Sequence, residues 1–191
     1  MVLVAGPGLP GADAEVAALA AALPGARHLR GDEATVRAVL PALAGVDVAH
    51  IAAHGLFRAD NPQLSSLRLA DGPLTGYDLE GLASPPRTVV LSACDAGLTG
   101  VRSGEEVQGL VAVLLALGTG AVIAAVAPVA DDLTAAFALD LHARLADGVP
   151  PPSALAEVQQ DWSGRGVREA VTATSFVCFG GGRPAERGSR G

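Results

Sequence analysis

A histidine and a cysteine, each at the end of a hydrophobic run, are the residues of this 191-residue chain best suited to chemistry. Residues 46–53 lead to His54, and residues 88–93 lead to Cys94. Runs of Val, Ile, Leu and Ala bounded by polar residues or Gly are typical of strands buried in a parallel sheet. An imidazole beside a thiol is the minimal apparatus for nucleophilic catalysis by cysteine. The sequence therefore predicts a His54–Cys94 dyad.

The predicted dyad requires both strands to end at the same edge of one sheet, where ligands bind in α/β proteins. The thiolate would attack a carbonyl carbon, the imidazole would protonate the leaving amine, and water would release the acyl-enzyme. The backbone N–H groups of Gly55 and Cys94 are the predicted donors to the developing oxyanion. The sequence names no residue that orients the imidazole of His54.

Each of the two residues also has an ordinary structural interpretation. A histidine on an apolar strand is more often a hydrogen-bonded core residue, and a buried cysteine usually behaves as an inert small hydrophobe. Two details favour function: both residues end their strands, and glycines (Gly55 and Gly97) follow them closely. A Gly-rich loop over residues 95–104 follows the cysteine.

Alternating strand and helix patterns define the expected fold. Strands are predicted at 2–5, 27–29, 46–53, 88–93, 121–126 and 172–179, and helices at 12–23, 32–43, 76–82, 105–117, 131–145 and 153–162. A hairpin is expected over 64–74, with Asp71-Gly72 as its turn. This order predicts a three-layer α/β sandwich with a mostly parallel central sheet and helices on both faces. Residues 1–180 are expected to form one domain, and 181–191 a flexible tail.

The composition narrows the classes of function. A formal net charge of −7 argues against binding to nucleic acid or an anionic membrane, which both need a positive surface. Residues 107–130 carry no charge, but Gly118-Thr119-Gly120 divides them into a helix-like and a strand-like half, so we expect no membrane span. With two cysteines and no basic leader at the N-terminus, the chain is expected to be cytoplasmic.

Two other motifs have weaker functional interpretations. Residues 6–11 match the Gly-x-Gly-x-x-Gly spacing of dinucleotide-binding loops, but Pro7 and Pro10 remove backbone donors and acids follow at the helix start. His50 and His54 lie four residues apart, which suits zinc on a helix rather than on a strand. We therefore expect no cofactor and no metal.

Several segments together resemble the CHAT domains of the caspase-like clan of cysteine peptidases. They include the His54-Gly55 pair and Leu91-Ser92-Ala93-Cys94, and the similarity runs in order from about residue 2 to residue 180 over 50–57, 67–72, 89–94, 104–105, 117–121, 129–132 and 176–179. The resemblance implies a caspase-like α/β sandwich with His54 and Cys94 as the dyad. It further implies an endopeptidase acting on a protein substrate in a bacterial signalling or defence role. A regulatory or tetratricopeptide-repeat protein is the partner it suggests.

In the caspase-like clan an acidic residue near the nucleophile often sets the preference for the residue before the cleaved bond. Four acids are candidates for recognising a basic residue there: Asp95, Glu105, Asp131 and Asp132. Asp131 and Asp132 also precede a predicted helix, so capping is the simpler explanation for these two. The alternative to a peptidase is a catalytically silent scaffold of the same fold that binds partner proteins.

Overall fold

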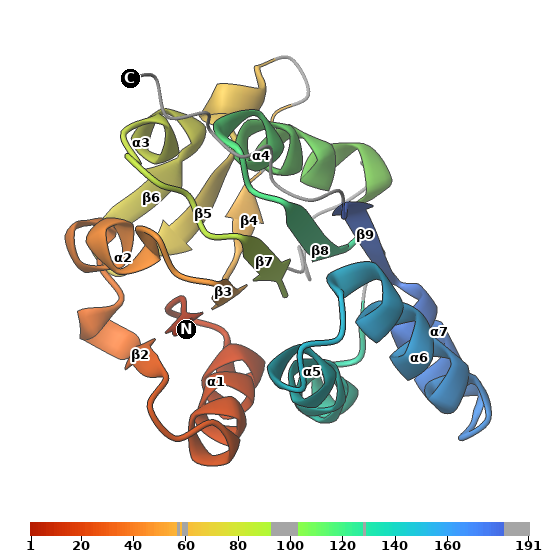
Figure 1. Cartoon of the computed structure of the whole chain (residues 1–191). Coiled ribbons are helices and arrows are strands. Elements are labelled where there is room, and N and C mark those ends of the chain that lie inside the picture. Colours follow the sequence, from red (N-terminus) through yellow and green to blue (C-terminus); the bar gives the residue numbers. More distant parts are fainter. Residues whose placement is uncertain (57, 59–60, 93–102, 128, 182–191) are drawn as a thin grey trace.

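A six-stranded sheet forms the centre of the protein. The computed structural model describes residues 1–56, 58, 61–92, 103–127 and 129–181 (Figure 1). Neighbouring strands are parallel except for the last pair, which is antiparallel. The strand order is β2 (Arg27–Leu29), β1 (Val2–Ala5), β3 (Val48–Ala52), β7 (Thr88–Leu91), β8 (Ala121–Ala125) and β9 (Phe176–Gly180). The predicted mostly parallel sheet is thus confirmed.

Helices cover both faces of this sheet, as Figure 1 shows. One layer holds α1 (Pro10–Ala22), α5 (Asp131–Ala146), α6 (Pro151–Ser163) and α7 (Val167–Thr174). The other holds α2 (Val36–Leu43), α3 (Gly76–Glu80) and α4 (Ser103–Leu117). A second, antiparallel sheet packs with this layer and consists of β4 (Gly55–Leu56), β5 (Ser66–Leu69) and β6 (Gly72–Thr75). Short 3-10 turns lie at Gly31–Glu33 and Pro62–Leu64.

Alternation along each central strand supplies both layers with apolar side chains. In β1, Val2 and Val4 join the core beneath α2 and α4, whereas Leu3 and Ala5 pack against α1. A strand buried on both faces therefore reads as a continuous hydrophobic run, which is why these strands could be predicted.

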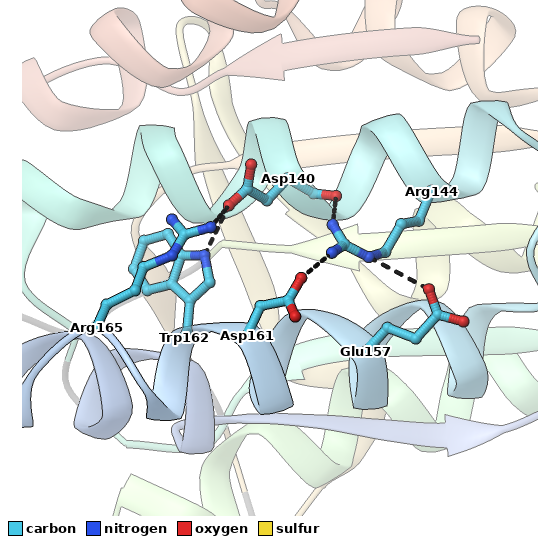
Figure 2. Close-up of polar contacts among 6 residues, drawn as sticks. All are labelled: Asp140, Arg144, Glu157, Asp161, Trp162 and Arg165. Atoms are coloured by element: carbon cyan, nitrogen blue, oxygen red, sulfur yellow. Dashed lines mark hydrogen bonds and ion pairs between the residues drawn. The ribbon is translucent and has the colours of Figure 1, made fainter.

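Polar contacts join α5 to α6 (Figure 2). The buried Trp162 indole N–H donates to Asp140 Oδ2 at 2.7 Å, and Arg165 donates to the same oxygen at 2.8 Å. The Arg165 guanidinium also lies 5.0 Å from the Trp162 ring centre. Arg144 of α5 donates to the Asp140 carbonyl and pairs with Asp161 of α6. These contacts hold α5 and α6 against each other.

The uncharged stretch over 107–130 has the predicted organisation. It consists of the end of α4, a turn at Gly118 with φ of +105°, and β8. Within the described part of the chain, no helix combines the length and the apolar character needed to cross a membrane.

Three local predictions were wrong. The expected last strand begins later, because Thr172 to Thr174 complete the helix α7 and the strand starts at Phe176. The expected helix over 32–43 is split into a 3-10 turn and α2, whose N-cap is Thr35. The hairpin turns at Ala70-Asp71 rather than Asp71-Gly72, since Leu69 pairs with Gly72.

Gly6 permits a close approach that fixes the chain just before His54. Its N–H donates to the Ala52 carbonyl at 2.7 Å, and an added Cβ would lie 2.6 Å from both the Ala53 Cβ and the Arg68 carbonyl oxygen. Packing therefore requires glycine at position 6, the first residue of the loop over 6–11.

We predict that Gly6→Ala destabilises the protein by about 1–3 kcal/mol, because two backbone segments must move to admit the methyl group. Urea unfolding measures the change. Gly164→Ala is the matched control, since its added Cβ meets its nearest neighbour at an ordinary 3.7 Å. Equal stability of the Gly6 variant and wild type would show that the segment yields freely.

Candidate active site

The two strands that precede His54 and Cys94 lie side by side and run parallel. Residues Val48 to Ile51 of β3 pair in order with Thr88 to Leu91 of β7. The Ser92 N–H then donates to the Ile51 carbonyl at 3.0 Å, which extends the contact past the end of β7. His54 lies three residues beyond Ile51, and Cys94 lies three residues beyond Leu91 in the sequence. Cys94 itself is outside the described residues, so the dyad stays a prediction.

His54 lies at the point where the chain leaves the main sheet. The buried Ala53 precedes it, and β4 begins at the next residue. Its carbonyl accepts a hydrogen bond from the Arg68 N–H at 2.8 Å, which ties this point to β5. The residue is half-buried and lines a pocket of about 430 Å³. The backbone at His54 is therefore held in place beside the pocket that the residue lines.

The pairing of β4 determines where the Gly55 N–H points. Gly55 is opposite Leu67 in an antiparallel ladder. Since the bond at this rung runs from Arg68 N–H to the His54 carbonyl, Gly55 and Leu67 form a non-hydrogen-bonded pair. The Gly55 N–H consequently points away from β5. That direction leaves it available as the predicted oxyanion donor, whose partner, the Cys94 N–H, is outside the described residues.

The four candidate acids are not brought together by the described structure. Asp95 is outside the described residues, and the side chains of Glu105 in α4 and Asp131 in α5 are not described. Asp132 is exposed and accepts two hydrogen bonds from one Arg168 nitrogen, at 2.8 and 3.0 Å. The N-cap of α5 is Ala130, so Asp131 and Asp132 are the first two helical residues.

A buried chain of polar side chains runs behind the site, between the sheet and the layer of α1 and α5. His142 Nε2 of α5 lies 3.0 Å from His50 Nδ1 of β3, and His50 Nε2 lies 3.1 Å from Glu15 Oε1 of α1. The Ser92 hydroxyl donates to Glu15 Oε2 at 3.0 Å. All four residues are buried. We refer to Glu15, His50, Ser92 and His142 as the core polar chain.

The protonation of the core polar chain follows from burial. Desolvation and the neighbouring His50 both lower the pKa of His142 well below its usual value, so its imidazole is neutral. When His142 Nε2–H donates to His50 Nδ1, His50 accepts at Nδ1 and carries its own proton on Nε2. That nitrogen is the one that lies near Glu15. The His50–Glu15 contact is close but not aligned as a hydrogen bond. It is therefore an electrostatic contact, and the Ser92 hydroxyl supplies the directed bond to the carboxylate.

Sequence reasoning missed this chain. Asp13 and Glu15 both resemble helix-dipole partners, but α1 begins at Pro10, so Glu15 falls in the second turn. The signal was a lone acid on the apolar side of an Ala-rich helix. Glu15 contacts His50 and not His54, so it does not supply the missing orienting residue. Among the residues with described positions, no three His, Cys, Asp or Glu side chains are grouped to hold a metal ion.

The sheet, its two helical layers and the antiparallel sheet that follows the His54 strand define a caspase-like α/β sandwich. The sequence model of the CHAT domain family matches residues 2–173. The chain therefore belongs to the CHAT domain family, as its motifs indicate. No match was found among curated proteins.

We predict that Glu15→Ala costs roughly 3 kcal/mol or more of folding stability, because it leaves His50 and Ser92 buried without their shared partner. Glu15→Gln should cost less, since an amide oxygen still accepts from Ser92. Chemical denaturation at neutral pH gives both values. The control is Asp13→Asn, an exposed acid on the same helix, which should change stability by less than about 0.5 kcal/mol. A loss no larger at Glu15 than at Asp13 would contradict this role.

We further predict that His142 makes the protein acid-sensitive. Its native pKa is lowered, so below about pH 6.5 the unfolded chain binds a proton that the native state does not. Stability then falls as pH falls, by up to about 1.4 kcal/mol per pH unit for one proton. In His142→Gln this part of the slope should disappear, whereas His28→Gln, at an exposed site on β2, should keep it. Parallel slopes for wild type and His142→Gln would refute the assignment.

Proposed function

We propose that this protein is a cysteine endopeptidase that uses His54 and Cys94 to cleave a protein substrate. The single observation that carries the proposal is the pairing of β3 with β7. Because Ile51 is opposite Leu91 in adjacent parallel strands, β3 and β7 end at the same edge of the sheet. In the sequence, His54 and Cys94 follow these two residues by three positions each. Membership of a peptidase-like family adds to this argument.

The proposed mechanism divides the work between side chains and backbone. His54 takes the Cys94 thiol proton, and the thiolate forms a bond to the substrate carbonyl carbon. The Gly55 N–H, which points away from β5, donates to the oxyanion together with the Cys94 N–H. His54 then gives its proton to the leaving amine. A water molecule, deprotonated by His54, cleaves the thioester and restores the thiol.

The finer parts of the proposal concern the substrate and the setting. A basic residue before the cleaved bond remains the expectation from Asp95, Glu105 and Asp131. Asp132 is a weaker candidate, because Arg168 already neutralises its carboxylate. A signalling or defence role, with a regulatory or tetratricopeptide-repeat partner, completes the proposal on the basis of family resemblance.

A cleavage and labelling experiment tests the dyad. Wild type should cleave members of a fluorogenic peptide panel, and Cys94→Ala and His54→Ala should each lose at least about a thousandfold of kcat/KM. Cys178 serves as an internal reference for alkylation, because burial raises the pKa of its thiol and slows its reaction. Cys94 should label faster than Cys178 in wild type, and this difference should shrink in His54→Ala.

The competing scaffold function gives the opposite result. If wild type cleaves no peptide and Cys94 labels no faster than Cys178, the endopeptidase proposal fails. The protein would then act by binding partners through the same fold.

A further inference from the structure

The pocket beside His54 lies on the outer face of the antiparallel sheet. Its described lining comes from His54, from both residues of β4, and from the β5–β6 hairpin. In β5, Leu67 and Leu69 belong to the hydrophobic core, so alternation directs Arg68 between them to the outer face. Arg68 is exposed and is one of the residues that line the pocket.

Arg68 brings a positive charge that the described structure does not neutralise. Among the described residues, no carboxylate pairs with its guanidinium, and no other lining residue carries a permanent charge. Two acids that follow Arg68 in the sequence have other partners: Asp71 accepts from the Val36 N–H at 2.7 Å, and Asp78 caps α3. By contrast, the exposed Arg168 is bound to an aspartate. In a chain of net charge −7, Arg68 thus has no acidic partner within the described part of the structure, although it lines the same pocket as His54.

We infer that this pocket is a substrate subsite that binds an Asp or Glu side chain of the peptide through Arg68. The inference rests on the proposed peptidase function and adds to it a second determinant of specificity. A guanidinium offers two parallel N–H donors to a carboxylate. The side-chain amide of Asn has the same shape as the Asp carboxylate but no negative charge, so it should bind Arg68 less tightly. Because the Arg68 backbone N–H also holds the His54 carbonyl, the bound acid would be fixed relative to the imidazole.

Scanning peptides test the subsite. The probes are alanine-based, fluorophore-quencher peptides with one basic residue and a single Asp or Asn at each other position in turn. At one position, wild type should prefer Asp over Asn by about fivefold in kcat/KM at low salt. The preference should shrink in roughly 0.5 M salt, because an exposed ion pair is screened.

Variants assign the preference to one side chain. Arg68→Gln should lose the preference for Asp over Asn, and Arg68→Lys should retain part of it. The control is Arg87→Gln, which should keep the preference. Arg87 is an exposed arginine that pairs with Asp47 at the opposite edge of the sheet. When wild type cleaves the peptides, a preference that is absent at every position, or that survives in Arg68→Gln, overturns the inference.

Binding separates this inference from the peptidase proposal. Fluorescence anisotropy of the same Asp and Asn peptides with Cys94→Ala protein reports recognition without cleavage. The subsite is supported if an Asp peptide binds more tightly than its Asn counterpart and this difference is lost in Cys94→Ala/Arg68→Gln. If wild type also cleaves nothing, only the peptidase proposal fails. Equal binding of the two peptides, or no binding of either, overturns the subsite.

Discussion

The contact of Glu15 with His50 and Ser92 is the constraint on which the arrangement of the site depends. A carboxylate without water is stable only if surrounding groups replace its hydration. Here the replacements come from β3 and from the residue that follows β7, while α1 supplies the acid. The helix and the ends of two strands are therefore fixed together. A shift of one strand along the other would separate the carboxylate from one of its partners.

The contacts of Glu15 hold the chain close to the predicted nucleophile, Cys94. Ser92 is held twice, by its hydroxyl to Glu15 and by its N–H to the Ile51 carbonyl. It is also two residues before Cys94 in the sequence. On the other strand, Gly6 and the Arg68 N–H hold the backbone around His54. The segments before Cys94 and around His54 are thus both held in place. Ser92 is held by hydrogen bonds to Glu15 and Ile51, and the backbone around His54 by its close contacts with Gly6 and Arg68.

The sequence predicted the features that local patterns encode. Doubly buried strands read as continuous apolar runs, and the hairpin showed its turn residues. The turn was misplaced by one residue because the Asp71 carboxylate binds the Val36 N–H at the start of α2, a contact between segments far apart in sequence. Thr172 and Thr174 favour strand by propensity, yet they lie in the last turn of a helix. The core polar chain was not predictable, since it joins residues from three separate elements and the residue that follows a fourth.

The chain leaves the main sheet at His54, and this brings the proposed catalytic histidine next to the pocket that Arg68 lines. In a purely parallel sheet the next element would be a crossover helix on one face of the sheet. Here β4 turns into an antiparallel sheet instead, and its second strand returns to bond with the His54 carbonyl. The same rung directs the Gly55 N–H away from β5 and places the Arg68 backbone next to the histidine. One antiparallel pairing therefore determines the direction of the Gly55 N–H, the proposed oxyanion donor, and the position of the Arg68 backbone beside the pocket.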